Sequence, residues 1–203
     1  MYGDREDYGR HLCASGAGQE EDGDDPGEVY GQVKPHPDLE ILRDASGMDV
    51  WVNADLAVVI LETAVTDFPI AKMLMAEPTQ SPIVLTGYGR GDSNLVYGDR
   101  HHGRNEITRL RRLDSGSIEM LAETQKMPDG KAGSHVRGGD SGGGCWSTGD
   151  DGSEVLIGIA SAAAEATSGQ SISVFTSLYP HERWLRAQME EAQKEAGSSA
   201  ATR

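Results

Sequence analysis

The chain has 203 residues, a formal net charge of −15 and only 5% aromatic residues. Its length suffices for a large domain with a buried core, and its negative charge argues against nucleic acid and anionic membranes as partners. Its 26 glycines and 8 prolines favour short strands and turns over a helical bundle.

The N-terminal segment is polar and acidic. Residues 1–30 hold nine acidic residues against two arginines, without periodicity, and we expect residues 1–27 to be disordered. This start has neither the basic residues nor the apolar stretch of a signal peptide, and the longest apolar run, residues 56–61, is too short to cross a bilayer. Two cysteines, Cys13 and Cys145, allow at most one disulfide bond, and we expect Cys145 to pack inside.

The middle of the chain alternates between strand-like and turn-like segments. The Val- and Ile-rich segment 50–62 is the strongest strand candidate. A turn at Ser115–Gly116 divides residues 106–123 into two predicted strands. The other predicted strands lie within residues 28–42, 82–92, 154–164 and 170–179.

The C-terminal segment predicts a helix over residues 180–195. Pro180 suits its first turn, and Trp184, Leu185 and Met189 fall on one side. Residues 196–203 are expected to form a flexible tail.

The segment RGGDSGGGCW, residues 137–146, has too many glycines for a helix or an ordinary strand. It contains the pattern G-x-S-x-G around Ser141, which in α/β-hydrolases follows a buried strand and precedes a helix. Residues 125–138 contain no apolar run, and residues 147–153 are typical of a turn. These flanking segments argue against the α/β-hydrolase interpretation.

The same segment resembles the nucleophile loop of the trypsin/chymotrypsin family of serine proteases, Gly-Asp-Ser-Gly-Gly-Pro, with Gly144 in place of the proline. Further segments resemble that family in the right order: HPDL followed by ADLAVVILE, then LTGYG, LIGIAS and SVFTSLYPHERWL. The resemblance covers roughly residues 28–190. It implies an all-β fold of two antiparallel Greek-key β-barrels with a C-terminal helix, in a protease domain spanning residues 28–195. The opening strands of the first barrel have no counterpart, so we expect that barrel to be incomplete and the chain to be a truncated or decayed copy.

The resemblance implies a Ser-His-Asp catalytic arrangement. Ser141 would be the nucleophile and Asp55 the acid that orients the histidine. The N–H groups of Gly139 and Ser141 would form the oxyanion hole, because acyl transfer builds negative charge on the carbonyl oxygen. Asp140 would turn inward, to where members of the family receive the amino terminus made by zymogen cleavage.

The catalytic histidine is the weakest part of the match. The family order of His, Asp and Ser leaves His11 and His36, since only these precede Asp55. His36 lies in a stretch that resembles a non-catalytic one. His11 precedes Asp55 by 44 residues, close to the family's interval, but lacks the small apolar residues that normally come before the histidine. The base is therefore His11, a histidine upstream of Met1, or lost.

The resemblance also places the primary specificity pocket. His135 would stand at its floor, Ser161, Ala162 and Ala163 would form its walls, and Ser173 would lie at its back. Since no carboxylate would pair with a substrate cation, we predict cleavage after Glu, Gln or apolar residues rather than after Arg or Lys. Alternatively, His135 points to solvent and the pocket is simply apolar.

Two functions remain open from the sequence. The first is a serine endopeptidase that hydrolyses peptide bonds through an acyl-enzyme on Ser141. The second is a protease-like binding module without catalysis. Neither needs a cofactor; we expect no metal site, since His101 and His102 lack a zinc-ligand pattern, and we expect a monomer with a polypeptide as partner. The resemblance implies an extracellular or periplasmic location.

Overall fold

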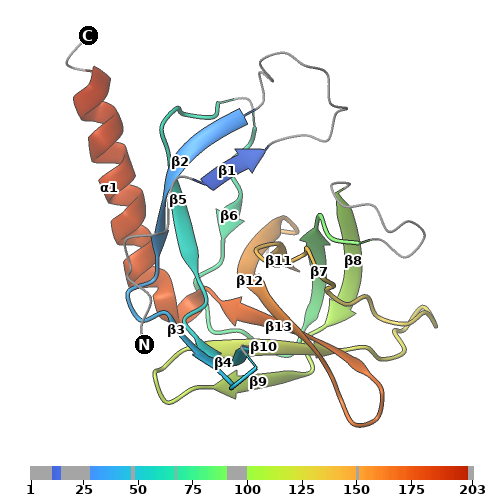
Figure 1. Ribbon diagram of the computed structural model, residues 1–203. Helices are drawn as coiled ribbons and strands as arrows, with labels where there is room; N and C mark the ends of the chain where they lie inside the picture. The colour runs from blue at the N-terminus through green and yellow to red at the C-terminus, as the bar shows by residue number, and fades with distance from the viewer. Residues whose placement is uncertain are drawn as a thin grey trace, which may run out of the picture.

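The computed structural model of the protein describes residues 11–14, 28–46, 49–66, 68–90, 100–149 and 151–200. These residues form mostly β-structure with a C-terminal helix, which confirms the predicted class (Figure 1). The strands are β1 (His11–Ala14), β2 (Glu28–Pro35), β3 (Glu40–Arg43), β4 (Asp49–Asn53), β5 (Ala57–Leu61), β6 (Lys72–Met73), β7 (Pro82–Gly87), β8 (His101–Glu106), β9 (Arg109–Arg112), β10 (Ile118–Glu123), β11 (Gly144–Thr148), β12 (Glu154–Glu165) and β13 (Ser171–Ser177). A 3-10 helix, η2 (Tyr179–His181), leads into helix α1 (Glu182–Ala200).

The described strands form three sheets. The largest has the order β8-β7-β11-β12-β13-β10-β9, with antiparallel neighbours, and β6 pairs in parallel with β12. A smaller sheet has the order β1-β2-β5, and β3 pairs with β4. The path of the largest sheet ends at β8 and β9, so the pairing seen in the described residues does not close a barrel. The two-barrel arrangement stays a prediction.

Two clusters of buried side chains form the core. The larger lies on the eight-stranded sheet, where Ile107, Met120, Cys145 and Phe175 are fully buried. The burial of Cys145 is as predicted, and burial raises the pKa of its thiol. The smaller cluster brings Leu56, Leu178 and Leu185 together with side chains of β5, β6 and β12. This second cluster attaches α1 to the sheets.

Helix α1 lies beside β2 and β5 (Figure 1). Leu185 is buried, and Lys34 of β2 forms an ion pair of 2.8 Å with Glu191. Met189, which the sequence places on the same side of the helix as Leu185, is 47% exposed. The helix also continues to Ala200, past the predicted end at residue 195. No helix in the described part of the chain has the length and apolar character needed to cross a membrane.

The predicted strand over residues 50–62 is in fact two strands. The chain turns at Ala54, Asp55 and Leu56, between β4 and β5. Ala54 has φ 47°, a left-handed conformation that costs a residue with a Cβ about 1–2 kcal/mol, and the Leu56 N–H donates to Ala54 O at 2.7 Å. Because of this turn, Asp55 belongs to neither β4 nor β5 and takes no part in their strand pairing. Its carboxylate lies next to β12, where it accepts the Ser161 hydroxyl.

The sequence did not predict five of the strands, β1, β3, β6, β8 and β11. β1 falls within the segment 1–27 that we expected to be disordered, and the other residues of that segment lie outside the described ones. β8 has the sequence HHGRNE and β11 the sequence GCWST, neither of which shows a clear apolar alternation. Their partners in the sheet determine that they are strands: β8 pairs with β7 over six positions, and β11 lies between β7 and β12.

Two buried histidines hold the turn around Asp55 in place. His36 and His181 are 7% and 6% exposed, and the His181 Nδ1 lies 3.1 Å from the His36 Nε2. The ring of Trp184 contacts the ring of His36 edge-on. The backbone N–H of His36 donates to Leu56 O at 2.8 Å. The histidine pair therefore connects α1 to the residue that follows Asp55.

Hydrogen bonding fixes the tautomers of both rings. The backbone N–H of Asp38 donates to the His36 Nδ1 at 3.1 Å, so a neutral His36 carries its proton on Nε2. That proton points at the His181 Nδ1, which leaves the His181 proton on Nε2, where it has no partner among the described residues. A second proton on His36 would lie on Nδ1 and face the Asp38 N–H, and a second proton on His181 would lie on Nδ1 and face the His36 Nε2–H. Both arrangements are unfavourable. Burial lowers the pKa of His36, and burial together with His36 lowers the pKa of His181 to about 4.

We expect stability to fall as the pH decreases from 6.5 to about 4. The unfolded chain binds protons at histidine near pH 6.5 and the folded chain resists them, so the unfolded state binds more protons within this window. The free energy of unfolding should decrease by about 2–3 kcal/mol because of the His36–His181 pair, and this decrease should level off below pH 4. The measurement is urea unfolding at each pH, comparing wild type with His181→Gln.

The matched control is His102→Gln, at an exposed histidine. His181→Gln should flatten the dependence on pH, and His102→Gln should leave it unchanged. Equal slopes for wild type and His181→Gln would show that the pair does not carry the effect.

Candidate active site

The loop around Ser141 consists of two successive β-turns that share Asp140. The Asp140 N–H donates to Arg137 O at 3.0 Å, and the Gly143 N–H donates to Asp140 O at 2.9 Å. The third residue of each turn is a glycine, Gly139 with φ 96° and Gly142 with φ 84°. This combination defines type II turns, which require a positive φ at that position. Two of the glycines are thus explained by backbone conformation.

The turns leave two backbone donors without partners. Within the part of the chain that the structure describes, the N–H groups of Gly139 and Ser141 donate to no acceptor. Both residues are exposed, and so is the Ser141 side chain. Two unpaired N–H groups two residues apart, on either side of Asp140 and next to a hydroxyl, are suited to bind a negatively charged oxygen.

The neighbouring glycines allow this loop to lie directly against β7 and β11. A Cβ on Gly143 would come within 2.1 Å of Thr86 O and 2.8 Å of Asp140 O, both backbone atoms. A Cβ on Gly144 would come within 2.4 Å of the Trp146 ring, whose Nε1–H donates to the Thr86 Oγ1 at 3.0 Å. Positions 143 and 144 therefore require glycine because a side chain would collide with other parts of the protein, whether or not a ligand also approaches the loop.

The Asp140 carboxylate points into the protein, as predicted. Its Oδ1 accepts the N–H of Gly89 at 2.8 Å, and its Oδ2 accepts the N–H of Arg137 at 2.8 Å. Gly87 and Gly89 are buried, and a Cβ on either would meet the carboxylate at 2.1 and 2.7 Å. The segment LTGYG therefore provides a space for the carboxylate. The resemblance assigned an amino terminus to this carboxylate, whereas its partners here are two backbone amides.

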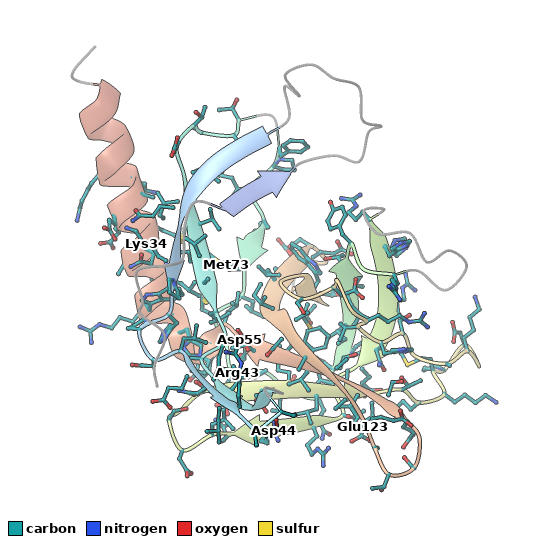
Figure 2. All side chains as sticks on the ribbon, viewed as in Figure 1. Lys34, Arg43, Asp44, Asp55, Met73 and Glu123 are labelled. Carbon is teal, nitrogen blue, oxygen red and sulfur yellow. The ribbon has the colours of Figure 1, made fainter. Side chains whose placement is uncertain are left out.

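Strand β12 connects the Ser141 loop to Asp55. The Gly142 N–H donates to Ala160 O at 2.9 Å, and the Ala160 N–H donates to Gly143 O at 2.8 Å. The next residue, Ser161, donates its hydroxyl to the Asp55 Oδ2 at 2.6 Å. Figure 2 shows Asp55 near the middle of the molecule. Asp55 and Ser141 are 86 positions apart in the sequence. Two consecutive residues of β12 hold them in place: Ala160 binds the loop that contains Ser141, and Ser161 binds Asp55.

An irregularity in the sheet directs Ser161 toward Asp55. The register between β12 and β13 pairs Ala160 with Phe175 and Ala162 with Val174, so Ser161 is the extra residue of a β-bulge. A bulge changes the direction of a side chain relative to the regular alternation of a strand. Ser161 was expected in the wall of the specificity pocket, and its hydroxyl is instead hydrogen-bonded to Asp55.

The register does not bring His11 to Asp55. His11 in β1 lies opposite Gly31 of β2, and Gly31 lies opposite Leu61 at the end of β5. Asp55 precedes Ala57 at the other end of β5, and the five residues from Ala57 to Leu61 span about 13 Å. In Figure 1, β1 correspondingly lies along the upper part of β2, away from Asp55. The strand pairing therefore gives no support to His11 as the base.

The other described histidines have different surroundings. His36 and His181 are paired with each other, as described above. His101, His102 and His135 line a cavity of about 340 Å³ together with Arg137 and Asp140. Within the described ranges, no group of three or more His, Cys, Asp or Glu residues could hold a metal ion.

The residues predicted for the specificity pocket are distributed over two places. His135 lines the 340 Å³ cavity together with Asp140 and residues of β7 and β8. Ser173 is fully buried, and its hydroxyl accepts the N–H of Val136 at 2.9 Å. Ala162 and Ala163 lie in the pairing of β12 with β13 and have exposed side chains. Ser173 therefore holds Val136, in the irregular segment that leads into the Ser141 loop.

No family model matches the chain, and no curated protein matches it significantly.

We predict that Gly143→Ala is more destabilising than Gly142→Ala by about 2 kcal/mol or more. An alanine at position 143 would collide with backbone atoms that cannot move away easily, whereas position 142 has open space and only the strain of its positive φ. That strain alone costs about 1–2 kcal/mol. The measurement is the free energy of unfolding in urea.

Gly152→Ala serves as the matched control, since Gly152 has φ 77° and open space around it and lies in the turn between β11 and β12. It should behave like Gly142→Ala. Equal losses at positions 142 and 143 would mean that the loop does not lie against Thr86 as described.

Proposed function

We propose that the chain has a trypsin/chymotrypsin-like fold of two β-barrels, the first incomplete, and that Ser141 is the nucleophile of a serine endopeptidase site. The observation that carries this proposal is the pair of type II turns that leaves the Gly139 and Ser141 N–H groups unpaired beside an exposed hydroxyl. The connection through Ala160 and Ser161 to Asp55 supports it, because an aspartate close to the nucleophile is the group that would orient a histidine.

The proposed reaction is acyl transfer from a polypeptide. The Ser141 Oγ attacks the carbonyl carbon of the scissile bond while a base takes its proton, and the oxygen becomes negatively charged. The N–H groups of Gly139 and Ser141 stabilise this charge. The amine then leaves with the proton, and water hydrolyses the acyl-enzyme. Asp55 acts by holding the base in the correct tautomer, and Ser161 holds Asp55.

A second candidate function is a protease-like binding module without catalysis. The position of β1 favours it, because a serine hydroxyl without a neighbouring base is a weak nucleophile. In that case the two free N–H groups would bind a carbonyl or carboxylate oxygen of a polypeptide, and no covalent bond to Ser141 would form.

Labelling with a fluorophosphonate separates the two functions. The endopeptidase proposal predicts that the probe labels the wild-type chain on one serine, and that Ser141→Ala abolishes the labelling. The measurement is intact-mass spectrometry followed by peptide mapping. Ser46→Ala, at an exposed serine in a turn, is the matched control and should label like wild type.

No labelling of the folded wild-type chain would leave the binding module as the function of this site. Labelling that persists in Ser141→Ala would contradict both candidates, since the reactive hydroxyl would then lie elsewhere. If labelling occurs, His11→Ala decides the base, and unchanged labelling would remove His11 from the site.

A further inference from the structure

A second cavity, of about 400 Å³, lies where helix α1 begins, at the lower end of that helix in Figure 1. Its wall is formed by the segment after β2, the end of β4, the turn between β9 and β10, η2 and the first turns of α1. A cavity of this volume can hold a small organic molecule. None of the lining residues belongs to the Ser141 loop, so the cavity is separate from the candidate active site.

The cavity wall contains a buried hydrogen-bond donor without a partner. His181 lines the cavity and is 6% exposed, and its Nε2 has no acceptor among the described residues. This nitrogen carries the proton of the neutral ring, because Nδ1 accepts the Nε2–H of His36. A buried N–H group without an acceptor is unfavourable, and a ligand that supplies an oxygen would remove this penalty. The donor therefore favours a ligand with an acceptor group over a metal ion, which needs a nitrogen lone pair.

The other buried polar groups of the wall have partners. Asn53 is 3% exposed, and its Oδ1 accepts the hydroxyl groups of Ser115 and Ser117. The Asn53 Nδ2 donates to Asp38 O at 2.9 Å. The Asp38 N–H donates in turn to the His36 Nδ1 at 3.1 Å. These contacts hold the wall in place and distinguish it from His181, whose donor is unpaired.

Two charged side chains also line the cavity. Arg183, in the first turn of α1, is exposed, and its guanidinium can form strong, directional hydrogen bonds with a carboxylate. Asp38 carries the opposite charge, but its side chain is 75% exposed, so water and salt screen its repulsion of an anion. The combination of the His181 N–H with a cation favours a carboxylate over a neutral acceptor.

The remaining wall is largely apolar. Pro37, Pro180, Trp184 and Ala187 line it, and the Trp184 ring is held edge-on against the His36 ring at a centroid distance of 4.6 Å. An aromatic ring offers a flat apolar surface on which another apolar or aromatic group gains contact area. A small inorganic anion would leave this surface without a partner, whereas an organic anion would cover it.

We propose that this cavity binds a small organic carboxylate with an apolar or aromatic group. The carboxylate accepts the His181 Nε2–H and pairs with Arg183, and the apolar group lies against Trp184. The His181 Nε2 is covered by neighbouring atoms, so binding includes a small side-chain adjustment of the wall, which is common in recognition. The proposal is independent of the chemistry at Ser141, because these three residues take no part in that site.

The experiment titrates the full chain with phenylacetate at neutral pH and follows the indole N–H signals by two-dimensional NMR. The Trp184 signal, assigned with Trp184→Phe, should shift and saturate with a Kd of about 1–10 mM, as expected for so small a ligand. The Trp146 signal is the internal control, since Trp146 lies in β11 outside the cavity wall, and it should not move. No shift of the Trp184 signal at about ten times the expected Kd would overturn the proposal.

Two related probes test the two parts of the ligand separately. Phenylacetamide keeps the ring and an acceptor oxygen but has no charge, and acetate keeps the charge but has no ring. Each should bind at least about tenfold more weakly than phenylacetate. Equal binding of phenylacetamide would overturn the assignment of an anion, and equal binding of acetate would overturn the assignment of an apolar group.

Arg183→Gln should weaken phenylacetate binding by about tenfold or more, because hydrogen bonds to charged groups are strong. Arg186→Gln is the matched control, since Arg186 lies in the same helix, pairs with Glu182 and does not line the cavity. This variant should bind like wild type. Equal Kd values for wild type and Arg183→Gln would overturn the proposal.

His181→Phe tests the buried donor, because phenylalanine keeps an aromatic ring and removes the N–H group. It should also weaken binding by about tenfold or more, and urea unfolding checks that the variant is folded under the conditions of the titration. If His181→Phe is unfolded, the comparison of Arg183→Gln with Arg186→Gln decides the proposal. A folded His181→Phe that binds phenylacetate like wild type would overturn the role of the His181 donor.

Discussion

The arrangement of the candidate site depends on the backbone of Ala160 in β12. Its C=O accepts the N–H of Gly142 and its N–H donates to Gly143 O, so the Ser141 loop is attached to the strand as a further pairing partner. The bulge at Ser161 then directs the next side chain to Asp55. A regular strand would alternate its side chains without this change, and the carboxylate would lack its hydroxyl partner.

The glycines of the Ser141 loop and of the LTGYG segment beside it have three separate physical reasons. Gly139 and Gly142 supply the positive φ of two type II turns. Gly143 has no space for a side chain because Thr86 lies against it, and Gly87 and Gly89 leave space for the Asp140 carboxylate. A glycine-rich surface turn without function would satisfy the first reason alone. The other two show a loop that is packed on its inner side and presents its donors on its outer side.

The sequence predicted the elements whose side chains alternate or repeat with a clear period. The strands around the Ser115–Gly116 turn, the pair formed by β12 and β13, and the start of the C-terminal helix are confirmed. Residues 50–62 were predicted as one strand because their apolar content continues through a turn that depends on tertiary contacts of His36. β8 was missed because HHGRNE forms a strand only through its partner β7. In these cases non-local contacts override local preference.

The residues of the candidate site also divide into those with a local sequence signal and those whose arrangement depends on non-local contacts. Gly139, Asp140 and Ser141 were proposed because their glycine-rich segment resembles a known nucleophile loop, and this signal is contained in a short stretch of sequence. The contact of Ser161 with Asp55 depends on a bulge, and the partners of Asp140 depend on how β7 approaches the loop, so a linear pattern carries no signal for either. The pairing of His36 with His181 joins residues 145 positions apart, and nothing in the neighbouring sequence of either indicates it.

The most direct test of this account is a crystal structure of the chain with a peptide boronic acid, which forms a tetrahedral, negatively charged adduct on a serine hydroxyl. The account predicts boron bonded to the Ser141 Oγ, with one boronate oxygen within hydrogen-bonding distance of the Gly139 and Ser141 N–H groups. Asp140 should still accept the Gly89 and Arg137 amides, and Ser161 should still donate to Asp55. A structure in which the Gly139 and Ser141 N–H groups point away from the Ser141 side chain, with or without bound boronate, would contradict the account.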